Sequence, residues 1–277
     1  MNTDLKLGLI GLSIEQSRSP ALHCLAGRLS GISVTYDLIR LDSAIPESFD
    51  KMLSLCQSQK YYGVNVTYPF KERAAEVARI ESEQVRRLGA VNTVRFVSES
   101  EMQGFNTDFT GFKRAFDSRY SGQPPGKVAL IGAGGIGRAI AFGLVDLGAE
   151  ELRIFDQEAQ KAESLALTLK SRSELQIRTC ATLEDTVSDV EGIVNATPIG
   201  MYNHPGTAIP RAMVSTQSWA FDAVYTPVET QFLLEAKEAG LETLSGYELF
   251  IYQGIEAFKI FSGVYVDESR LRAGLTQ

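Results

Sequence analysis

The sequence predicts an α/β fold with two domains, and three observations lead to this prediction. Strand-like and helical patterns alternate along most of the 277 residues. The glycine-rich segment Gly132–Gly137 directly follows an apolar run and opens a helical pattern. A polar stretch with proline and glycine, residues 117–127, interrupts the periodicity. We therefore expect an α/β domain over residues 1–110, completed by residues 246–277, and a Rossmann-type doubly wound parallel sheet over residues 111–245.

Short runs of apolar and β-branched residues mark the strands of both predicted domains. In the first domain they are Leu5–Ile10, Val34–Leu38, Gly63–Thr67, Val91–Phe96 and Met102–Phe105. In the second domain they are Val128–Ile131, Leu152–Phe155, Gly192–Ala196 and Ala220–Val224. Helical periodicity covers Ala21–Leu29, Lys71–Ile80, Phe109–Phe116 and the segments that begin at Ile136 and Glu158. The helical pattern Tyr247–Gly263 is more apolar than one solvated helix needs, so we expect it to pack against both domains.

The composition favours small-molecule chemistry. The formal net charge is -7, the pI is near 5.1, and no dense lysine and arginine run occurs, which argues against a nucleic-acid partner. No apolar run reaches membrane-spanning length, so we expect no membrane association and a cytoplasmic location. His23, His204 and three widely spaced cysteines form no pattern typical of a metal centre, and none is expected.

The glycine-rich segment predicts a dinucleotide site. Gly132 permits a tight turn, Gly134 lets a diphosphate approach the backbone, and Gly137 allows close packing of helix on strand. The helix N-terminus stabilises the diphosphate charge. Asp156 ends the next strand, where a carboxylate accepts hydrogen bonds from ribose hydroxyls and repels a 2′-phosphate. Because no arginine occurs at residues 157–160, we expect NAD to be preferred over NADP.

Lys71 is a candidate catalytic residue. It follows the strand-like run Gly63–Thr67, and Pro69 suits the first turn of a helix that begins here. The partial positive charge of a helix N-terminus disfavours a cation, which eases proton release from the lysine. On this segment alone, a catalytic lysine and a solvated lysine on an ordinary helix remain alternatives.

Three further polar residues lie near predicted helix starts. Ser17 and Ser19 can bind a carboxylate, although Ser19, with a proline after it, also suits an ordinary N-cap. Asp108 either caps the following helix or takes part in catalysis. Lys71 and Asp108 on successive units of one sheet can share a proton with a substrate hydroxyl.

Eight segments, in order along nearly the whole chain, resemble the shikimate/quinate dehydrogenase family. They are Ser17–Pro20, Asn65–Lys71, Gly89–Thr93, Asn106–Asp108, Gly132–Gly137, Asn195–Met201, Asp222–Tyr225 and Tyr252-Gln253. The resemblance implies that Lys71 and Asp108 form a catalytic dyad. It implies contacts to the substrate carboxylate from Ser17, Ser19, Thr67 and Tyr225, and contacts to ring hydroxyls from Asn92 and Gln253.

The resemblance also implies how the cofactor is held. The segment Asn195–Met201 would lie along the nicotinamide, and the last helices would return to the first domain to deliver Gln253. The implied cofactor-binding residues are Gly132, Ala133, Gly134, Gly135, Ile136, Gly137, Asp156, Thr197, Pro198, Met201, Val224 and Gly246.

Three departures favour one branch of this family. Gln16 stands where many members have histidine, and Phe109 stands where glycine is usual. The run 155–157, Phe-Asp-Gln, replaces the Asn-Arg-Thr typical of NADP-dependent members. Together these departures resemble the NAD-using quinate/shikimate branch, and we expect tolerance of both substrates.

The leading hypothesis is reversible oxidation of the C3 hydroxyl of quinate or shikimate by hydride transfer to NAD, with Lys71 and Asp108 handling the proton. An aminoshikimate or related cyclic hydroxy-acid dehydrogenase is an alternative, and so is a non-catalytic NAD-binding sensor of the same fold. A short-chain-type dehydrogenase is disfavoured because no lysine stands four residues after a tyrosine. We expect a monomer or a homodimer.

Overall fold

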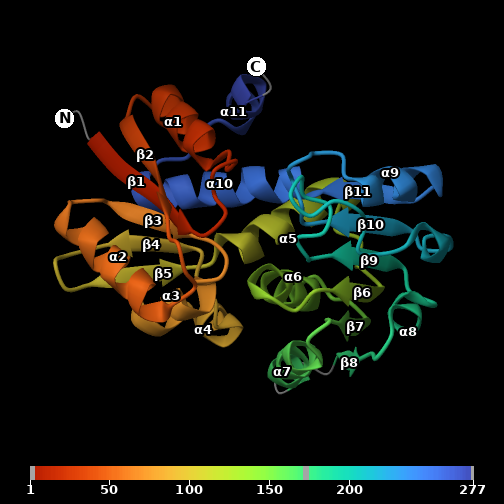
Figure 1. Cartoon of the computed structure of the whole chain (residues 1–277). Helices are drawn as coiled ribbons and strands as arrows, with labels where there is room; N and C mark the ends of the chain where they lie inside the picture. The colour runs from red at the N-terminus through yellow and green to blue at the C-terminus, as the bar shows by residue number, and fades with distance from the viewer. Residues whose placement is uncertain (1–3, 171–174, 276–277) are drawn as a thin grey trace. The chain divides into compact units, whose positions relative to one another are not determined.

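The structure is a computed structural model that describes residues 4–170 and 175–275. Its contacts divide the chain into two compact units. Unit 1 comprises Met1–Thr107 and Ile251–Gln277, and unit 2 comprises Asp108–Phe250. The helices α5 (Thr107–Tyr120) and α10 (Gly246–Ser262) carry the chain from one unit to the other (Figure 1).

Unit 1 alternates strands and helices through most of its length. Besides the end of α10, its elements are β1 (Asp4–Gly11), α1 (Ser19–Ser30), β2 (Ser33–Arg40), α2 (Pro46–Ser58), β3 (Gly63–Val66), α3 (Lys71–Val77), α4 (Glu83–Leu88), β4 (Thr93–Phe96), β5 (Met102–Phe105) and α11 (Glu268–Leu275). The sheet order is β2-β1-β3-β4-β5. The first three strands are parallel, whereas β4 is antiparallel to both of its neighbours.

The antiparallel pairing of β4 with β5 follows from the short connection between them. A short connection joins β4 to β5, and its Val97 amide donates to the Glu101 carbonyl over 2.9 Å. Such a connection is too short for a parallel crossover, which needs a dozen or more residues. The β4–β5 pair therefore forms a hairpin.

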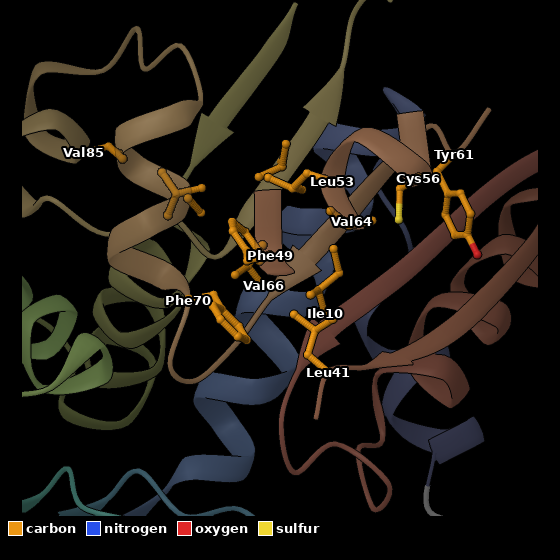
Figure 2. Packing of buried hydrophobic residues seen from close by; sticks show 13 residues of the cluster. Ile10, Leu41, Phe49, Leu53, Cys56, Tyr61, Val64, Val66, Phe70 and Val85 are labelled. Carbon is orange, nitrogen blue, oxygen red and sulfur yellow. The ribbon is translucent and has the colours of Figure 1, made fainter. Parts of the chain in front are cut away.

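The sheet of unit 1 has an apolar core on each face, as alternation along β1 requires. Ile10 joins one core, to which α2 contributes Phe49 and the residue before α3 contributes Phe70 (Figure 2). The two rings stack with centroids 5.0 Å apart. On the other face, Leu7 packs in a cluster with Phe261 of α10. The end of α10 is therefore part of the core of unit 1.

Unit 2 is a doubly wound parallel sheet. Besides α5 and the start of α10, its elements are β6 (Lys127–Ile131), α6 (Gly135–Asp146), β7 (Glu151–Phe155), α7 (Ala159–Lys170), β8 (Gln176–Thr179), α8 (Leu183–Val187), β9 (Gly192–Asn195), the 3₁₀ turn η1 (Arg211–Met213), β10 (Trp219–Asp222), α9 (Gln231–Glu238) and β11 (Glu242–Ser245). The order is β11-β10-β9-β6-β7-β8, with every pair parallel. The order reverses between β6 and β9, which is the switch point where open α/β sheets bind ligands.

Helices cover both faces of this second sheet. On one face, Phe232 of α9 packs in a cluster with Ala220 of β10. On the other face, Phe112 of α5 meets Phe221 of β10 edge-on, with ring centroids 5.1 Å apart. Successive residues of β10 thus serve opposite faces, as expected for a strand buried on both sides.

The predicted fold class is confirmed, and the differences are local. Strands β8 and β11 were not predicted, because these edge strands lack an apolar run: each has one buried residue among its four. The helix predicted over Lys71–Ile80 ends at Val77. The polar stretch 117–127 lies inside unit 2, where it joins α5 to β6. Among the described residues, no helix is long and apolar enough to span a membrane.

Candidate active site

Thr67 and Lys71 follow the carboxyl end of β3 in unit 1. The Thr67 amide donates to the Ile10 carbonyl over 3.0 Å, and the Val91 amide donates to the Lys71 carbonyl over 2.8 Å. Lys71 is the first residue of α3, as predicted. Pro69 was expected inside the first turn of that helix, but it lies two residues earlier, in the turn that ends β3. The backbone therefore fixes Lys71 beside the segment that leads to Asn92.

Asn92 lies buried between β4 and the start of α5. Its Oδ1 accepts hydrogen bonds from the Thr107 amide (2.8 Å) and the Thr93 hydroxyl (3.1 Å). Its Nδ2 lies 3.0 Å from the Thr107 hydroxyl, and only 3% of the residue is exposed. The amide therefore has one defined orientation, which is what a residue that reads a substrate hydroxyl requires.

Hydrogen bonds extend from Asn92 in both directions across unit 1. Tyr36 donates to Asn65 (2.8 Å), and Asn65 donates to Thr93 (3.0 Å), which donates to Asn92. Beyond Asn92, the Thr107 hydroxyl donates to Oε1 of Gln253 over 3.4 Å. We call these six residues the donor series, because each can donate to the next: Tyr36, Asn65, Thr93, Asn92, Thr107 and Gln253.

A buried histidine lies beside the start of this series. The His23 ring stacks on Tyr36, with centroids 4.9 Å apart and the planes 14° from parallel. Phe258 and Phe261 surround the same ring. Burial lowers the pKa of His23 to about 3, although a hydrogen bond with Asn65 opposes this shift. His23 therefore stays neutral near pH 7.

Asp108 follows the donor series directly in sequence. The helix α5 begins at Thr107, so Asp108 lies in its first turn and is not the N-cap that the sequence left as an alternative. The residue is 5% exposed and belongs to unit 2.

Ser17 and Ser19 lie together ahead of α1. Their hydroxyls are 3.1 Å apart, and the Ser17 hydroxyl accepts from the Ser19 amide over 3.2 Å. Ser19 also suited an N-cap, but the helix begins at Ser19, and Arg18 takes the cap position without a capping bond from its side chain to the helix. The hydroxyl that contacts a helical amide is thus that of Ser17.

The glycine-rich loop of unit 2 has the geometry that its sequence predicts. Gly132 has a φ of +101°, in the left-handed region that favours glycine. A Cβ on Gly137 would lie 2.0 Å from the Gly132 carbonyl oxygen, so only glycine allows helix and loop to approach this closely. A Cβ on Gly134 would meet nothing within 4 Å, which leaves the backbone open to a ligand. Gly135, Ile136 and Gly137 form the first turn of α6.

Asp156 lies against this loop. Its Oδ2 accepts from the Ala133 amide over 2.7 Å, and its Oδ1 accepts from the Glu158 amide over 2.9 Å. The carboxylate therefore stands at the end of β7 beside the loop, which is where a dinucleotide-binding fold has its ribose-binding acid. These residues fit a dinucleotide.

Asn195 organises the segment that follows β9. Its Oδ1 accepts from the amide (3.0 Å) and the hydroxyl (2.7 Å) of Thr197. Its Nδ2 donates to the Ile199 carbonyl (2.9 Å) and to Oδ1 of Asp222 (2.9 Å). Pro198 is exposed and Met201 is half-buried on the same segment.

Asp222 ends β10 and joins three segments. Besides the bond from Asn195, its Oδ1 accepts from the Val224 amide (3.0 Å), and its Oδ2 accepts from the Thr230 hydroxyl (2.5 Å). Burial raises the pKa of Asp222 to about 7, although these hydrogen bonds oppose the rise. We call Asn195, Asp222, Val224 and Thr230 the Asp222 hub.

The remaining predicted residues lie near the hub in unit 2. The Tyr225 ring stacks on Phe250 with centroids 4.7 Å apart. A Cβ on Gly246 would lie 2.5 Å from the Ala223 carbonyl oxygen, so α10 begins in close contact with the segment after β10.

The predicted site residues divide between the units. Unit 1 holds Ser17, Ser19, Thr67, Lys71, Asn92 and Gln253, whereas Asp108, Tyr225 and all the predicted cofactor-binding residues belong to unit 2. No individual role was predicted for Thr107, Asp222 or Thr230, and Asn195 was predicted only as the start of the segment Asn195–Met201. Thr230 alone left a local signal, because a threonine ahead of an apolar run is a typical N-cap, and its hydroxyl accepts from the Leu233 amide.

Comparison with known proteins gives agreement over both units. A model described as the shikimate dehydrogenase substrate binding domain matches residues 9–94, and one described as NADP oxidoreductase coenzyme F420-dependent matches residues 127–212. A quinate/shikimate dehydrogenase (NAD(+)) of Corynebacterium efficiens is 37% identical, over 99% of this chain and 98% of the relative. A shikimate dehydrogenase (NADP(+)) of Pseudarthrobacter chlorophenolicus is 33% identical, over 96% and 92%.

A solved structure gives the same agreement in three dimensions. Quinate dehydrogenase from Corynebacterium glutamicum, in complex with NAD, superposes with a TM-score of 0.88 at 34% identity, over 99% of each chain. The fold and the site define a two-domain α/β protein with an N-terminal substrate-binding domain and a Rossmann-type domain. The chain belongs to the shikimate/quinate dehydrogenase family.

Proposed function

We propose that this chain is an alcohol dehydrogenase that reversibly oxidises the C3 hydroxyl of quinate, shikimate or both, giving 3-dehydroquinate or 3-dehydroshikimate. The observation that carries this proposal is the match to a quinate/shikimate dehydrogenase (NAD(+)) over 99% of the chain. Because the match spans both units, it covers the substrate-binding and the dinucleotide-binding residues. Such chemistry needs soluble substrates and cofactor, and we propose that it takes place in the cytoplasm.

We assign the proton to Lys71 and Asp108. In the oxidation, the neutral Lys71 amine takes the proton of the C3 hydroxyl while a hydride leaves C3. The single bond between C3 and its oxygen becomes the C=O double bond of the ketone. NAD, when bound, accepts the hydride. Asp108 would hold the lysine in place beside the hydroxyl. In support, the Lys71 carbonyl is tied to Val91, next to Asn92, and Asn92 is tied to Thr107, next to Asp108.

We assign substrate recognition to two groups of polar side chains. The residues proposed for the carboxylate are Ser17, Ser19, Thr67 and Tyr225, and those proposed for ring hydroxyls are Asn92 and Gln253. The 3.1 Å separation of the Ser17 and Ser19 hydroxyls suits two contacts to one carboxylate. The fixed amide of Asn92 suits recognition of a hydroxyl.

We propose that NAD is preferred over NADP. The Asp156 carboxylate beside the loop would accept hydrogen bonds from the ribose hydroxyls and would repel a 2′-phosphate. The diphosphate would lie at the N-terminus of α6, against the open backbone at Gly134. The family includes proteins named for either cofactor, so the preference needs measurement.

A spectrophotometric matrix tests substrate and cofactor together. Quinate and shikimate are each assayed with NAD and with NADP, and kcat/KM is measured for the four pairs. We expect turnover with NAD on at least one acid and weaker turnover with NADP. A clear NADP preference would contradict the role of Asp156. Tight NADH binding without turnover of any cyclic hydroxy acid would favour a non-catalytic sensor, and turnover of aminoshikimate alone would favour that related dehydrogenase.

Replacement of Lys71 tests the proton transfer. We expect Lys71→Ala to lower kcat by about 10²- to 10⁴-fold, the range typical of a lost general acid–base group. Lys51→Ala, which removes an exposed lysine on α2, is the matched control and should keep wild-type kinetics. Near wild-type turnover in Lys71→Ala would remove this lysine from the chemistry.

A further inference from the structure

We infer that Asp222 is a positioning residue that holds the nicotinamide-side segments of unit 2 in their binding conformation. The inference rests on the proposed function for the role of those segments. Asp222 is the last residue of β10 and pairs in register with Asn195, the last residue of β9. Both residues are completely buried, at the carboxyl ends of neighbouring parallel strands. Ligands of open α/β sheets bind at this edge.

One carboxyl group connects the segments on which the predicted contacts stand. Through Asn195 it controls the segment with Thr197 and Met201, and through the Val224 amide it controls the segment after β10. Through Thr230 it is tied to the first turn of α9. Asp222 is thus an acceptor that all three segments share, and its hydrogen bonds help to set their relative positions.

The chemistry of Asp222 also sets the orientation of the Asn195 amide. Oδ1 of Asp222 accepts from the Val224 amide and from Asn195, so Asn195 directs its Nδ2 toward the carboxyl group. Oδ1 then faces Thr197 and accepts from both its amide and its hydroxyl. The Thr197 hydroxyl in turn accepts from the Ile199 amide over 3.2 Å. The conformation of this segment therefore depends on a group that would not itself touch the cofactor.

The free space around the carboxyl agrees with this role. Gly200 has a φ of +112°, so the segment turns sharply beside the hub. A Cβ on Gly200 would lie 3.8 Å from Oδ2 of Asp222, an ordinary van der Waals separation. Asp222 is completely buried beside this turn, and the exclusion of water strengthens the hydrogen bonds to its carboxyl group.

Two variants test the inference, each with the full-length protein. Asp222→Asn preserves the size of the side chain but replaces one acceptor oxygen with a donor. Thr230→Val removes the hydroxyl that Oδ2 accepts from, and Thr230→Ser, which restores a hydroxyl, is its matched control. NADH affinity is measured by fluorescence titration, and kcat and both KM values are measured by absorbance. All measurements are made well below the thermal midpoint of each variant.

We expect Asp222→Asn to weaken NADH binding and raise KM for NAD about tenfold, since one lost hydrogen bond corresponds to about that factor. KM for quinate or shikimate should change less than about twofold, because unit 1 holds most of the proposed substrate contacts. Thr230→Val should show the same pattern more weakly, and Thr230→Ser should restore wild-type values. If Asp222 had a purely structural role, the variant would lower the thermal midpoint, but KM for NAD would not rise more than KM for the acid.

The outcomes separate this inference from the proposed function. If Asp222→Asn folds and binds NADH as the wild type does, the inference is wrong although the activity stands; if only Thr230→Val folds, its unchanged NADH affinity leads to the same conclusion. If the wild type binds NADH but turns over neither acid, weakened binding by the variant still supports the inference. A wild-type protein that binds neither NADH nor NADPH contradicts both.

Discussion

Each of the two units contains a buried network of polar side chains, but the hydrogen bonds of the two networks are arranged differently. In unit 1 the donor series runs from Tyr36 to Gln253, and each member donates to the next. In unit 2 the hub converges on Asp222, which accepts from three directions. A series transmits orientation from one end to the other, whereas a hub fixes several segments around one point. The first form suits presentation of a single amide, and the second suits the shaping of a surface from several loops.

The networks also differ in charge. The donor series is built of amides and hydroxyls, and the ionisable group packed on it, His23, is held neutral by burial. The hub is centred on a carboxyl group whose pKa burial raises to about 7. One unit therefore buries a base that resists protonation, and the other buries an acid that resists ionisation. The stabilities of the two units should respond to pH in opposite directions.

The largest expected effect comes from replacing the asparagine of each network, Asn92 in unit 1 and Asn195 in unit 2. Asn92→Ala should lower kcat/KM about 10²- to 10³-fold, because a proposed substrate contact is lost and the Thr107 amide loses its acceptor. KM for the acid should rise while KM for NAD changes little. Asn195→Ala, the matched variant in unit 2, should raise KM for NAD instead. Steady-state kinetics with both substrates varied checks the contrast, and the same KM rising in both variants would show that the two networks do not act separately.

The next effect is the pH dependence of stability conferred by Asp222. Its pKa is raised in the folded protein, so its protonated form stabilises the fold fully below about pH 4, and this contribution is lost as pH rises to about 7. Between pH 5 and 7 the free energy of unfolding of the wild type should fall relative to that of Asp222→Asn by about 2 kcal/mol. Urea unfolding of both proteins at several pH values measures this difference. A difference that is constant with pH would mean that Asp222 is ionised throughout.

The smallest of these effects belongs to His23 and has the opposite sign. Its pKa is lowered in the folded protein, so its contribution is present above about pH 6.5 and is lost as pH falls toward about 3. Between pH 6.5 and 5 the wild type should lose about 2 kcal/mol relative to His23→Phe, which keeps a ring on Tyr36. The same urea experiment serves. Equal slopes for wild type and variant would show that the histidine is protonated inside the fold.

Most of the fold was predictable from the sequence because its signals are local. The apolar runs located nine strands, and the glycine-rich loop identified the second sheet. The edge strands β8 and β11 were not predicted, because a strand at the edge of a sheet needs no apolar run. The N-cap of α1 and the place of Pro69 ahead of α3 were misjudged because proline fits several positions near a helix start.

The site was less predictable, for a physical reason. Asp156 follows a predicted strand, and Asn92 lies in the segment Gly89–Thr93 that resembles the family. The partners that hold them come from distant segments: Thr107 lies 15 residues from Asn92, and Asp222 lies 27 residues from Asn195. No local periodicity encodes such a pairing. An aspartate at the end of a short apolar strand, such as Asp222, looks in the sequence like a polar residue that only ends the strand. The roles of Thr107, Asp222 and Thr230 therefore required the structure.

The discontinuity of unit 1 has a consequence for the newly made protein. A ribosome releases residues 108–250 before it releases the segment 251–277, so all of unit 2 is available to fold while unit 1 still lacks its last two helices. Until Phe261 arrives, the strand face that carries Leu5 and Leu7 has no cover from α10. The amino-terminal part of the chain thus completes its core last, and the apolar face of its strands stays uncovered until the final segment has been synthesised.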